Sequence, residues 1–454
     1  MKSTAEVDRL DPWLLRLGGV LILGALLAQL DATIVTVGIG AIGRGLTADL
    51  ASVQWVSTAY LLAVALVAPL SGWLTQRFGG KRVWLASVTL FVAASALCGL
   101  AWSAPALIVC RVLQGLGGGL MQPVGQALLA RHAGPSRIGR VVGIITVPIT
   151  FAPVAGPVIG GLILQVADWR WMFYVNVPIG LVTLLLAASI VPADDQETVR
   201  TRPDLVGLLL LPPGLAALVY GLSDTSQIEI LVAGVVLLIG YVVHALRTGK
   251  VSLLDLTLFT RRGFTLASVN TFLLGAALYS SMLLLPLYFA QVRGLNALQA
   301  GLLLAPQALG TALATPLAGK LTPKYGPRAV VLLGILLTMV GTVPFLFAGQ
   351  ELGLIPICVA LFLRGAGIGA TVPPNVAAIY TSVDRPQIPG ATSARTVLNR
   401  IGGSIGTAVL AFLLQDNLSS AGTPGVAYAD TFWWALALSA LTLIPAALYP
   451  GRTK

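Results

Sequence analysis

Long apolar runs follow one another along most of the chain, and each is bounded by charged residues, proline or glycine. A helix needs about 20 apolar residues to cross a hydrocarbon core of about 30 Å. Fourteen runs fit that requirement, at residues 14–37, 52–75, 83–101, 106–129, 139–165, 171–191, 205–222, 228–246, 264–290, 297–319, 329–348, 353–380, 390–414 and 431–449. Because the runs are continuous and show no alternation of polarity, they predict membrane-spanning helices rather than barrel strands.

The charge of the segments between the runs predicts an orientation. If all fourteen runs cross the membrane, the segments on the side of the termini hold twenty Lys and Arg residues. The opposite segments hold three, which are Arg44, Arg170 and Arg293. Positively charged loops favour the cytoplasm. We therefore expect a multi-pass protein of the cytoplasmic (inner) membrane with both termini in the cytoplasm and the first run retained, not cleaved as a signal.

Two motifs occur twice along the chain. The pattern Gly-x-Gly-x-Gly-x-x-x-Pro begins at Gly115 and again at Gly365, an offset of 250. The segment 72–79, which reads Gly-x-Leu-x-x-Arg-Phe-Gly, has a near copy at 319–326, an offset of 247. Two independent motifs at nearly the same offset indicate a duplication, and they predict two parallel bundles with a cavity between them.

The duplication and the fourteen runs together predict an all-α integral membrane protein with two six-helix bundles and two extra central spans. In order, we expect a cytoplasmic N-terminus (1–13), an N-terminal six-helix bundle (14–191), a cytoplasmic linker (192–204), two additional spans (205–246), a second cytoplasmic linker (247–263), a C-terminal six-helix bundle (264–449) and a cytoplasmic C-terminus (450–454). No soluble domain fits between the runs.

Composition agrees with a membrane protein, because 56% of residues are hydrophobic and 10% are charged, against about 25% charged in soluble domains. The net charge of +11 is spread over small groups of Lys and Arg, so the expected partner is anionic lipid and not nucleic acid. The three cysteines stand alone in apolar runs, which predicts packing and no metal site. No HExxH, Walker or GxSxG pattern occurs, so we expect neither an enzyme nor a cofactor.

Asp31 lies near the middle of the first run, far from either charged flank. The other sixteen acidic residues fall in loops or at the ends of runs, so Asp31 has no acidic competitor at membrane depth. Acidic residues inside membrane spans are costly and usually functional. A carboxyl group in a cavity that alternately wets and dries can bind and release a proton. The alternative is a structural role, in a fixed pair with an arginine or as a helix cap.

Several arginines also lie inside predicted spans. Arg111 is five residues into the fourth run, and its counterpart at the offset of 250 is Leu361. It either snorkels to the nearer surface or acts as the cationic partner of Asp31. Arg364, Arg395 and Arg400 lie in the twelfth and thirteenth runs. For them an anion site and snorkelling toward the helix ends are both open interpretations.

Two further segments suggest moving or closely packed parts. The first is a basic loop that carries the candidate gate residues Gly72, Gln76, Arg77, Gly79, Lys81 and Arg82. A basic loop alone is only the signature of a cytoplasmic segment, but its near copy at 319–328 favours a gate. The second segment, 152–161, contains Gly156-Pro157-x-x-Gly160-Gly161. Its glycines allow close helix packing, and its prolines, Pro153 and Pro157, predict a bend.

These segments resemble the major facilitator superfamily, and in particular its fourteen-span drug:proton antiporter branch of the EmrB/QacA type. The resemblance rests on residues 30–35, the loop 72–82, Arg111 with Gln114, the glycines at 156–161, and the segments 169–180 and 402–406. It implies that Asp31 responds to protons, that Arg111 relays its state, that the loop is a gate and that Gly156 to Gly161 form the antiporter motif.

The sequence departs from this branch at two places. Gln76 stands where an acidic residue is usual, which weakens any charge latch in the loop. After Asp31 the chain reads Thr36-Val37-Gly38-Ile39-Gly40 instead of the usual Asn and Ala-Leu-Pro, so the first span is expected to end or bend differently.

The expected function is proton-coupled antiport of amphipathic or cationic drug-like compounds across the cytoplasmic membrane by alternating access. The alternatives are export of a lipid or metabolite, proton symport, and a non-transporting scaffold or sensor. We expect a small-molecule substrate, protons and lipid as partners, and a monomer, with an accessory protein left open. The candidates for the substrate cavity, which packing would also explain, are Trp55, Tyr60, Gln122, Asn270, Gln307 and Asn375.

Overall fold

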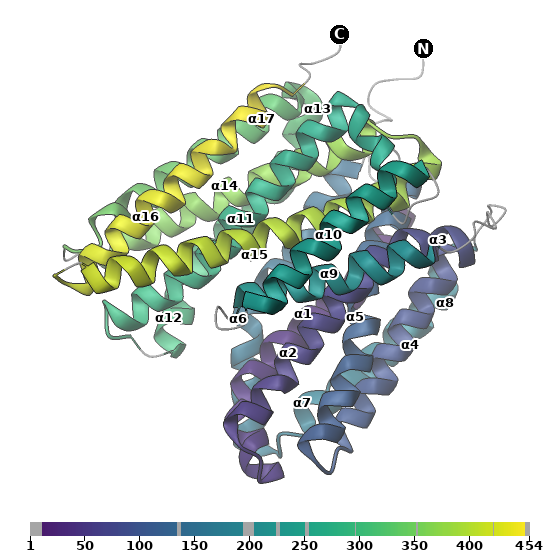
Figure 1. Ribbon diagram of the computed structural model, residues 1–454, viewed down its shortest axis with the longest axis horizontal. Helices are drawn as coiled ribbons and strands as arrows, with labels where there is room; N and C mark the ends of the chain where they lie inside the picture. Colours follow the sequence, from purple (N-terminus) through teal and green to yellow (C-terminus); the bar gives the residue numbers. More distant parts are fainter. Residues whose placement is uncertain are drawn as a thin grey trace.

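The computed structural model describes residues 11–133, 138–193, 204–223, 228–249, 254–295, 297–350, 353–420 and 422–449. Throughout these ranges the regular structure is α-helix or 3-10 helix, without a strand. Figure 1 shows two groups of long helices, one formed by the first part of the chain and one by the last. The prediction of an all-helical protein is confirmed.

The N-terminal half consists of the helices that precede residue 191. They are α1 (Pro12–Leu46), α2 (Leu50–Val67), η1 (Ala68–Leu70), α3 (Ser71–Phe78), α4 (Gly80–Gly99), α5 (Ala104–Ala133), α6 (Ile138–Val166), α7 (Trp171–Tyr174) and α8 (Asn176–Ile190). Asp11 caps α1 by accepting a bond of 2.9 Å from the backbone N–H of Trp13. Asp49 caps α2 in the same way through Ser52.

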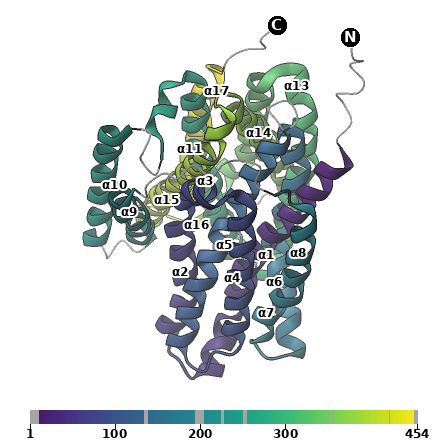
Figure 2. The same ribbon diagram turned by 90° about the vertical axis from the view of Figure 1, so that its right-hand side faces the viewer.

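The two extra helices are α9 (Leu205–Ser223) and α10 (Ile228–Thr248), which pack against each other. Helix α9 also contacts α2 in the N-terminal half and α15 in the C-terminal half. Figure 2 shows the pair together at one side of the molecule. Asp204 fixes the start of α9, because its carboxylate accepts from the backbone N–H of Gly207 at 2.8 Å and lies 2.7 Å from Nε2 of His244.

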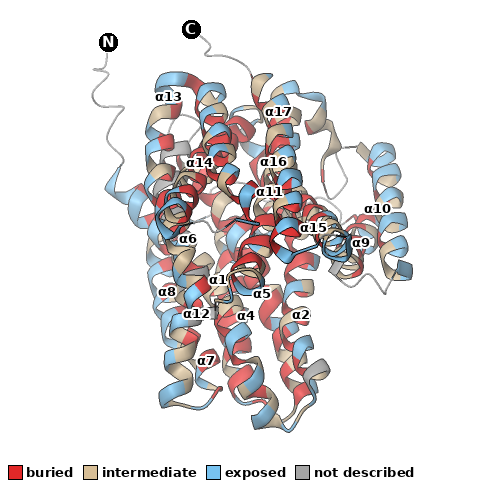
Figure 3. Ribbon diagram, turned by 90° about the vertical axis from the view of Figure 1, so that its left-hand side faces the viewer, coloured by how far each residue is buried: buried red, intermediate tan, exposed pale blue. Residues whose placement is uncertain are grey.

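The C-terminal half consists of the helices from residue 256 onward. They are η3 (Leu256–Thr260), α11 (Arg262–Gln291), α12 (Ala297–Leu303), α13 (Ala305–Thr342), η4 (Val343–Phe347), α14 (Leu354–Thr381), η5 (Arg385–Gln387), α15 (Ile388–Ser420), α16 (Pro424–Leu441) and α17 (Leu443–Ala447). In both halves the long helices enclose the buried residues, and exposed faces lie outside (Figure 3). Those outer faces carry apolar side chains such as Leu185 and Phe412, as contact with lipid requires.

The duplicated loop has the same backbone in both copies. Gly79, between α3 and α4, has φ 90° and ψ 148°. Gly326 interrupts α13 with φ 82° and ψ 157°. Only glycine adopts this conformation without strain, so both positions need it. The duplicated glycine motif also packs alike, since a Cβ on Gly115 would lie 2.6 Å from the carbonyl oxygen of Tyr60 and one on Gly365 would overlap that of Gln307.

Twelve helices within the described residues are long and apolar enough to cross a membrane, which makes this a multi-pass membrane protein. One of them, 299–347, has 49 residues and contains the break at Gly326. At 1.5 Å per residue it would extend about 70 Å, enough for two crossings. Helix α6, which has 29 residues, is not among the twelve. The count of fourteen spans therefore stays a prediction.

Two predicted span boundaries are wrong. The first span was expected at 14–37, but α1 continues as one helix through Gly38 and Gly40 to Leu46. Gly38 packs there against the end of the Met172 side chain in α7, which a Cβ on Gly38 would overlap. The last span was expected to begin at residue 431, whereas α16 begins at Pro424, which supplies the first helical residue.

The two halves meet where α3 and α15 begin. The hydroxyl of Ser393 in α15 donates to the carbonyl of Pro69 at 2.8 Å. At Gly72 the backbone of α3 approaches that of Pro389, with 3.1 Å between a Cβ built there and the carbonyl oxygen. Away from this contact the ends of the two helix groups diverge (Figure 1). Helix α6 makes the remaining large contact, with α13 and α14.

Candidate functional site

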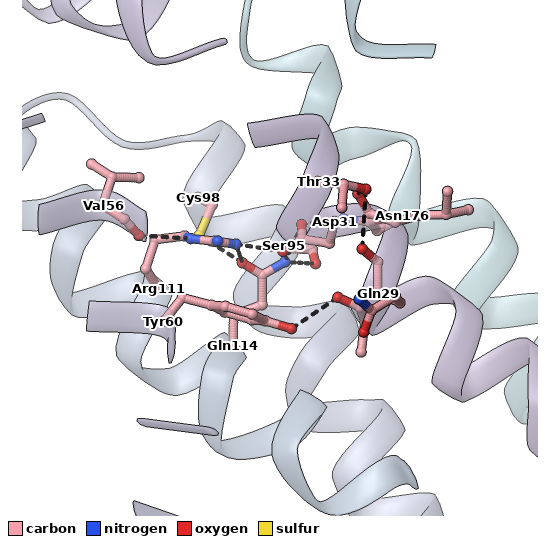
Figure 4. A network of polar contacts seen from close by, with 12 residues as sticks. Gln29, Asp31, Thr33, Val56, Tyr60, Ser95, Cys98, Arg111, Gln114 and Asn176 are labelled. Atoms are coloured by element: carbon pink, nitrogen blue, oxygen red, sulfur yellow. Dashed lines mark hydrogen bonds and ion pairs between the residues drawn. The ribbon is translucent and has the colours of Figure 1, made fainter. Parts of the chain in front are cut away.

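Asp31 lies in α1 inside the N-terminal half, with its side chain fully buried. One carboxylate oxygen is 2.5 Å from Nη1 of Arg111. The other oxygen accepts two amide N–H bonds, from Gln114 at 2.9 Å and from Asn176 at 2.8 Å. Figure 4 shows these donors converging on the carboxylate from different helices. The arrangement provides three donors for a carboxylate that water does not reach.

Arg111 points inward to Asp31, so it does not snorkel to the surface, and its side chain is 1% exposed. Its Nε donates to the carbonyl of Val56 at 3.1 Å, and its Nη1 also donates to Gln114 at 2.6 Å. The guanidinium lies over the ring of Tyr60, 4.1 Å from the centroid. Carbonyl, amide, aromatic face and carboxylate together hold a charge that would otherwise be costly to bury.

Gln114 connects the ion pair to α4. Its amide nitrogen also donates to the hydroxyl of Ser95 at 2.6 Å, and its oxygen accepts a weak bond from the thiol of Cys98 at 3.6 Å. The network therefore joins α1, α2, α4, α5 and α8. Sequence reasoning did not select Asn176 or Ser95. An asparagine at the start of an apolar span was the available signal for Asn176, whereas a lone serine such as Ser95 gives none.

Helix α6 packs tightly on α1 beside this network. A Cβ on Gly156 would overlap the side chain of Thr33, two residues from Asp31, and one on Gly160 would lie 3.1 Å from the carbonyl oxygen of Ile34. The hydroxyl of Thr33 donates across the contact to the carbonyl of Ala152 at 3.3 Å. The two glycines therefore bring the helices into backbone contact.

The other residues of that motif contribute differently. A Cβ on Gly161 would meet nothing within 4 Å. The bend expected from Pro153 and Pro157 stays a prediction, because the side chains of both prolines lie outside the described part of the chain.

The same glycine spacing packs the equivalent helices of the C-terminal half. Gly402 and Gly406 in α15 are 246 residues after Gly156 and Gly160. A Cβ on Gly402 would overlap the backbone of Phe272, and one on Gly406 would lie 2.6 Å from Cα of Ala276, both in α11. Close packing through Gly-x-x-x-Gly is thus common to both halves. What distinguishes Gly156 is its position beside Asp31.

The candidate gate loop lies at the junction of the two halves. Gly72 contacts α15, and Gly79 forms the turn into α4. Nζ of Lys81 donates to the carbonyl of Ala188 at the end of α8, at 2.9 Å. Gln76 and Arg77 are half-buried, whereas Arg82 is exposed. The loop therefore contacts α8 of the N-terminal half through Lys81 and α15 of the C-terminal half through Gly72.

The six candidates for the substrate cavity do not come together. Asn375 lines a cavity in the C-terminal half. The amide nitrogen of Asn270 donates to the side-chain oxygen of Asn375 at 3.3 Å. Gln307 accepts from Arg364 at 3.3 Å near the same cavity. Tyr60 belongs instead to the Asp31 network.

The remaining two candidates face elsewhere. Trp55 stacks on Tyr220 of α9, with 5.6 Å between ring centroids, and Gln122 is exposed. No three His, Cys, Asp or Glu side chains gather as a metal site among the residues with described positions.

Comparisons with known proteins identify the family. The model of the Major Facilitator Superfamily matches residues 21–306 and 267–454. The chain is 38% identical over 422 residues to "Multidrug resistance protein B homolog" of Mycobacterium tuberculosis (strain ATCC 25618 / H37Rv), which covers 90% of this chain and 77% of that one. It is 32% identical over 416 residues to "Multidrug export protein EmrB" of Haemophilus influenzae, covering 87% and 81%.

A solved structure of a double-tryptophan mutant of XylE has the same fold, with a TM-score of 0.71, 15% identity and coverage of 97% of both chains. The predicted two-bundle fold is therefore confirmed at the level of its overall architecture. From the matched family model and the curated relatives it follows that this chain is a transporter of the major facilitator superfamily.

Proposed function

We propose that this protein is a proton-coupled antiporter that exports amphipathic or cationic drug-like compounds across the cytoplasmic membrane by alternating access. The names of the relatives, a multidrug resistance protein and a multidrug export protein, support drug export. The observation that carries the coupling is the fully buried pair of Asp31 and Arg111. Because the pair is buried, the charge of the Asp31 carboxylate can change only if the groups packed around it change as well.

The proposed proton step exchanges one partner of Asp31 for another. With Asp31 ionised, Arg111 is held at 2.5 Å, and Gln114 and Asn176 donate to the second oxygen. A proton on Asp31 removes the negative charge and with it most of the attraction for Arg111. Arg111 then keeps only the carbonyl of Val56, the oxygen of Gln114 and the face of Tyr60. The two charge states therefore favour different packings of α1 against α5.

Helix α6 is positioned to pass that change to the other half. It touches α1 at Thr33, two residues beyond Asp31, and it packs on α13 and α14 of the C-terminal half. A shift of α1 by a few tenths of an ångström cannot be absorbed where Gly156 already lies in contact with Thr33. We propose that α6 moves with α1 and so alters the contact between the halves.

The junction at Gly72 and Ser393 is the proposed cytoplasmic gate. Its contacts lie where α3 and α15 begin, beside the basic loop 72–82, and the charge bias of the loops supports a cytoplasmic position for this junction. With this gate closed, bound substrate faces the opposite side, as export requires. Each proton that returns inward releases about 2.3 kcal/mol per 100 mV before any pH term, which is sufficient to oppose a substrate gradient.

Everted membrane vesicles with an imposed pH gradient test the proposal. We expect wild-type protein to accumulate a cationic dye such as ethidium and to release protons from the vesicle lumen when the dye is added. Asp31→Asn should abolish both. Asp168→Asn is the matched control, because Asp168 is a 52% exposed carboxylate paired with Arg170 at the surface. It should behave as wild type.

The same assay separates the alternatives. Dye movement in the direction of proton flow would identify symport, and the absence of flux for every compound tested would favour a scaffold or sensor. Transport restricted to lipids or metabolites in a compound panel would replace the drug assignment. Proton-linked export by Asp31→Asn at the wild-type rate would remove Asp31 from the mechanism.

A further inference from the structure

Arg364 is a buried cation in the C-terminal half without an acidic partner. It lies in α14, and 3% of its side chain is exposed. Its guanidinium donates to three neutral groups, the hydroxyl of Ser281, the hydroxyl of Thr342 at 3.2 Å and the amide oxygen of Gln307 at 3.3 Å. Arginine keeps its positive charge in proteins, and a buried charge is costly unless an opposite charge is near.

Within the described part of the C-terminal half, no carboxylate supplies that opposite charge. The six predicted spans between residues 264 and 449 contain no Asp or Glu. Asp384 pairs with Arg261 at 2.7 Å at the surface, and Asp416 and Asp430 are exposed. In the N-terminal half, Asp31 is already bound to Arg111. The charge on Arg364 therefore has no internal counter-ion among the residues that the structure describes.

The duplication shows how this imbalance differs from the N-terminal half. Helices α1 and α11 begin 250 residues apart, at Pro12 and Arg262. At that offset Asp31 corresponds to Ser281, and Gln114 corresponds to Arg364. Both halves thus place a polar contact between the first and fourth helices of the bundle. The N-terminal contact contains its own carboxylate, whereas the C-terminal contact has a serine in that position.

A cavity adjoins Arg364, and we call it the Arg364 pocket. It has a volume of about 80 Å³, and its polar lining residues are Thr271, Thr338, Arg364, Thr371, Asn375 and Arg395 among others. This space holds several waters or one small charged group, and not a whole drug-sized molecule. The rest of a larger ligand would have to lie outside it.

Arg395 gives the pocket a second cation. Its Nη2 donates to Gln126 of α5, so this side chain reaches the boundary between the halves, while the residues that line the pocket belong to the C-terminal half. Its Nε is buried and has no hydrogen-bond partner. Two guanidinium groups, one with a free donor, converge on a cavity that borders the expected path of the substrate. Paired arginines of this kind suit carboxylate, sulfonate or phosphate oxygens.

We propose that the Arg364 pocket binds the anionic group, carboxylate or sulfonate, of a transported amphipathic compound, whose apolar part lies between the two halves. The inference rests on the proposed function, and it extends the substrates from neutral and cationic amphiphiles to acidic and zwitterionic ones. The transported compound supplies the charge that the chain lacks at Ser281. Cationic compounds that carry no acid group do not use this pocket.

Three variants separate charge from packing. Arg364→Gln removes the cation but keeps hydrogen-bonding capacity. Ser281→Asp places a carboxylate against Arg364, as Asp31 is placed against Arg111, and so fills the anion site from within while Arg364 stays present. Ser281→Asn is the matched neutral control of similar size. The aspartate variant keeps the test decisive even if Arg364→Gln fails to fold.

Equilibrium binding to the purified protein in lipid nanodiscs is the measurement, with three matched probes. These are 2-naphthoate, 2-naphthylmethanol and (2-naphthylmethyl)trimethylammonium, which share a ring and differ in charge. We expect Arg364→Gln and Ser281→Asp to weaken binding of the naphthoate by about tenfold or more, since hydrogen bonds to a charged group are lost. Binding of the cationic probe should change less than about twofold, within the scatter of neutral contacts. Ser281→Asn should resemble wild type for all three.

Two results would overturn the proposal. One is equal weakening of all three probes by Arg364→Gln, which would make Arg364 a structural brace between α11, α13 and α14. The other is full protection of the protein against unfolding by sodium chloride or phosphate alone, without competition between these anions and naphthoate for binding. That result would assign the pocket to a resident inorganic ion. Because binding is measured without a gradient, a failure of proton-linked export would leave this test intact, and a failure here would leave export intact.

Discussion

The polar cores of the two halves have the same position in the duplicated fold but opposite chemistry. In the N-terminal half, Asp31 and Arg111 neutralise each other inside a hydrogen-bonded network. In the C-terminal half, Ser281 and Arg364 occupy the corresponding region and leave a positive charge without an acid. The first half therefore contains the carboxyl group that we propose to gain and lose a proton. The second contains the site that we propose to take its missing charge from a ligand.

The positions that stayed alike in both halves are those that control packing. Gly79 and Gly326 form the same turn, and Gly156 and Gly402 bring equivalent helices into contact. The backbone geometry is therefore the same in both halves, whereas the charged side chains at the centres of the two bundles differ. On this account, coupling belongs to one half and recognition of acidic compounds to the other.

The largest loss of stability is expected when the pair of Asp31 and Arg111 is broken. The matched substitution in the C-terminal half is at Arg364. Arg111→Gln leaves the Asp31 carboxylate buried without its cation, which should cost about 3–5 kcal/mol of stability. Arg364→Gln removes a charge without orphaning an acid, so its cost should be about 1 kcal/mol or less. Thermal unfolding of the purified variants measures the difference in Tm.

The double variant Asp31→Asn with Arg111→Gln checks the reason for that difference. It should recover much of the stability lost in Arg111→Gln, because no unpaired charge remains. Equal losses for Arg111→Gln and Arg364→Gln would contradict the contrast drawn between the two cores.

A smaller effect is expected when one amide donor is removed from Asp31. Asn176→Ala deletes the bond of 2.8 Å to the carboxylate and should cost about 1.5–3 kcal/mol, the usual value for a hydrogen bond to a charged group. Asn417→Ala is the control, since Asn417 is an amide that bonds the neutral hydroxyl of Thr431. Thermal unfolding compares the two. A loss for Asn176→Ala no greater than that for Asn417→Ala would show that the amide does not stabilise an ionised Asp31.

The smallest expected effect concerns the packing that both halves share. Gly156→Ala and Gly402→Ala each force a methyl group into an adjoining helix and should cost about 1–3 kcal/mol. Gly161→Ala, where a Cβ meets nothing within 4 Å, should be silent. At equal stability, Gly156→Ala should lose more of the proton-linked transport in vesicles than Gly402→Ala, because it displaces Thr33 beside Asp31. Equal transport by the two would mean that the contact of α6 with α1 carries no coupling.

Much of the architecture could be predicted from the sequence, because membrane spans and repeats depend on local patterns. The helices, the duplication and the isolation of Asp31 follow from apolar runs, glycine spacing and a census of acids. The end of α1 could not be predicted, because the helix continues beyond the predicted end at residue 37 to Leu46, and Gly38 packs there against Met172, which is distant in sequence. Long-range contacts of this kind leave no local signal.

The composition of the site was less accessible than the fold. Arg111 could be proposed as a partner of Asp31 because charged residues inside spans are rare. Asn176 and Ser95 could not be selected, since neutral polar residues are common in apolar helices and only the folded structure brings them to Asp31 and Gln114. The contact between Ser281 and Arg364 likewise required the folded structure.

Proton release from the purified protein tests the role of Asp31 most directly. In weakly buffered detergent solution, addition of a transported cationic compound should release protons from the wild type, because antiport requires that binding of the compound displaces the proton carried by Asp31. Asp31→Asn should bind the compound and release none, and Asp168→Asn should release as many as wild type. Undiminished proton release from Asp31→Asn would contradict the account.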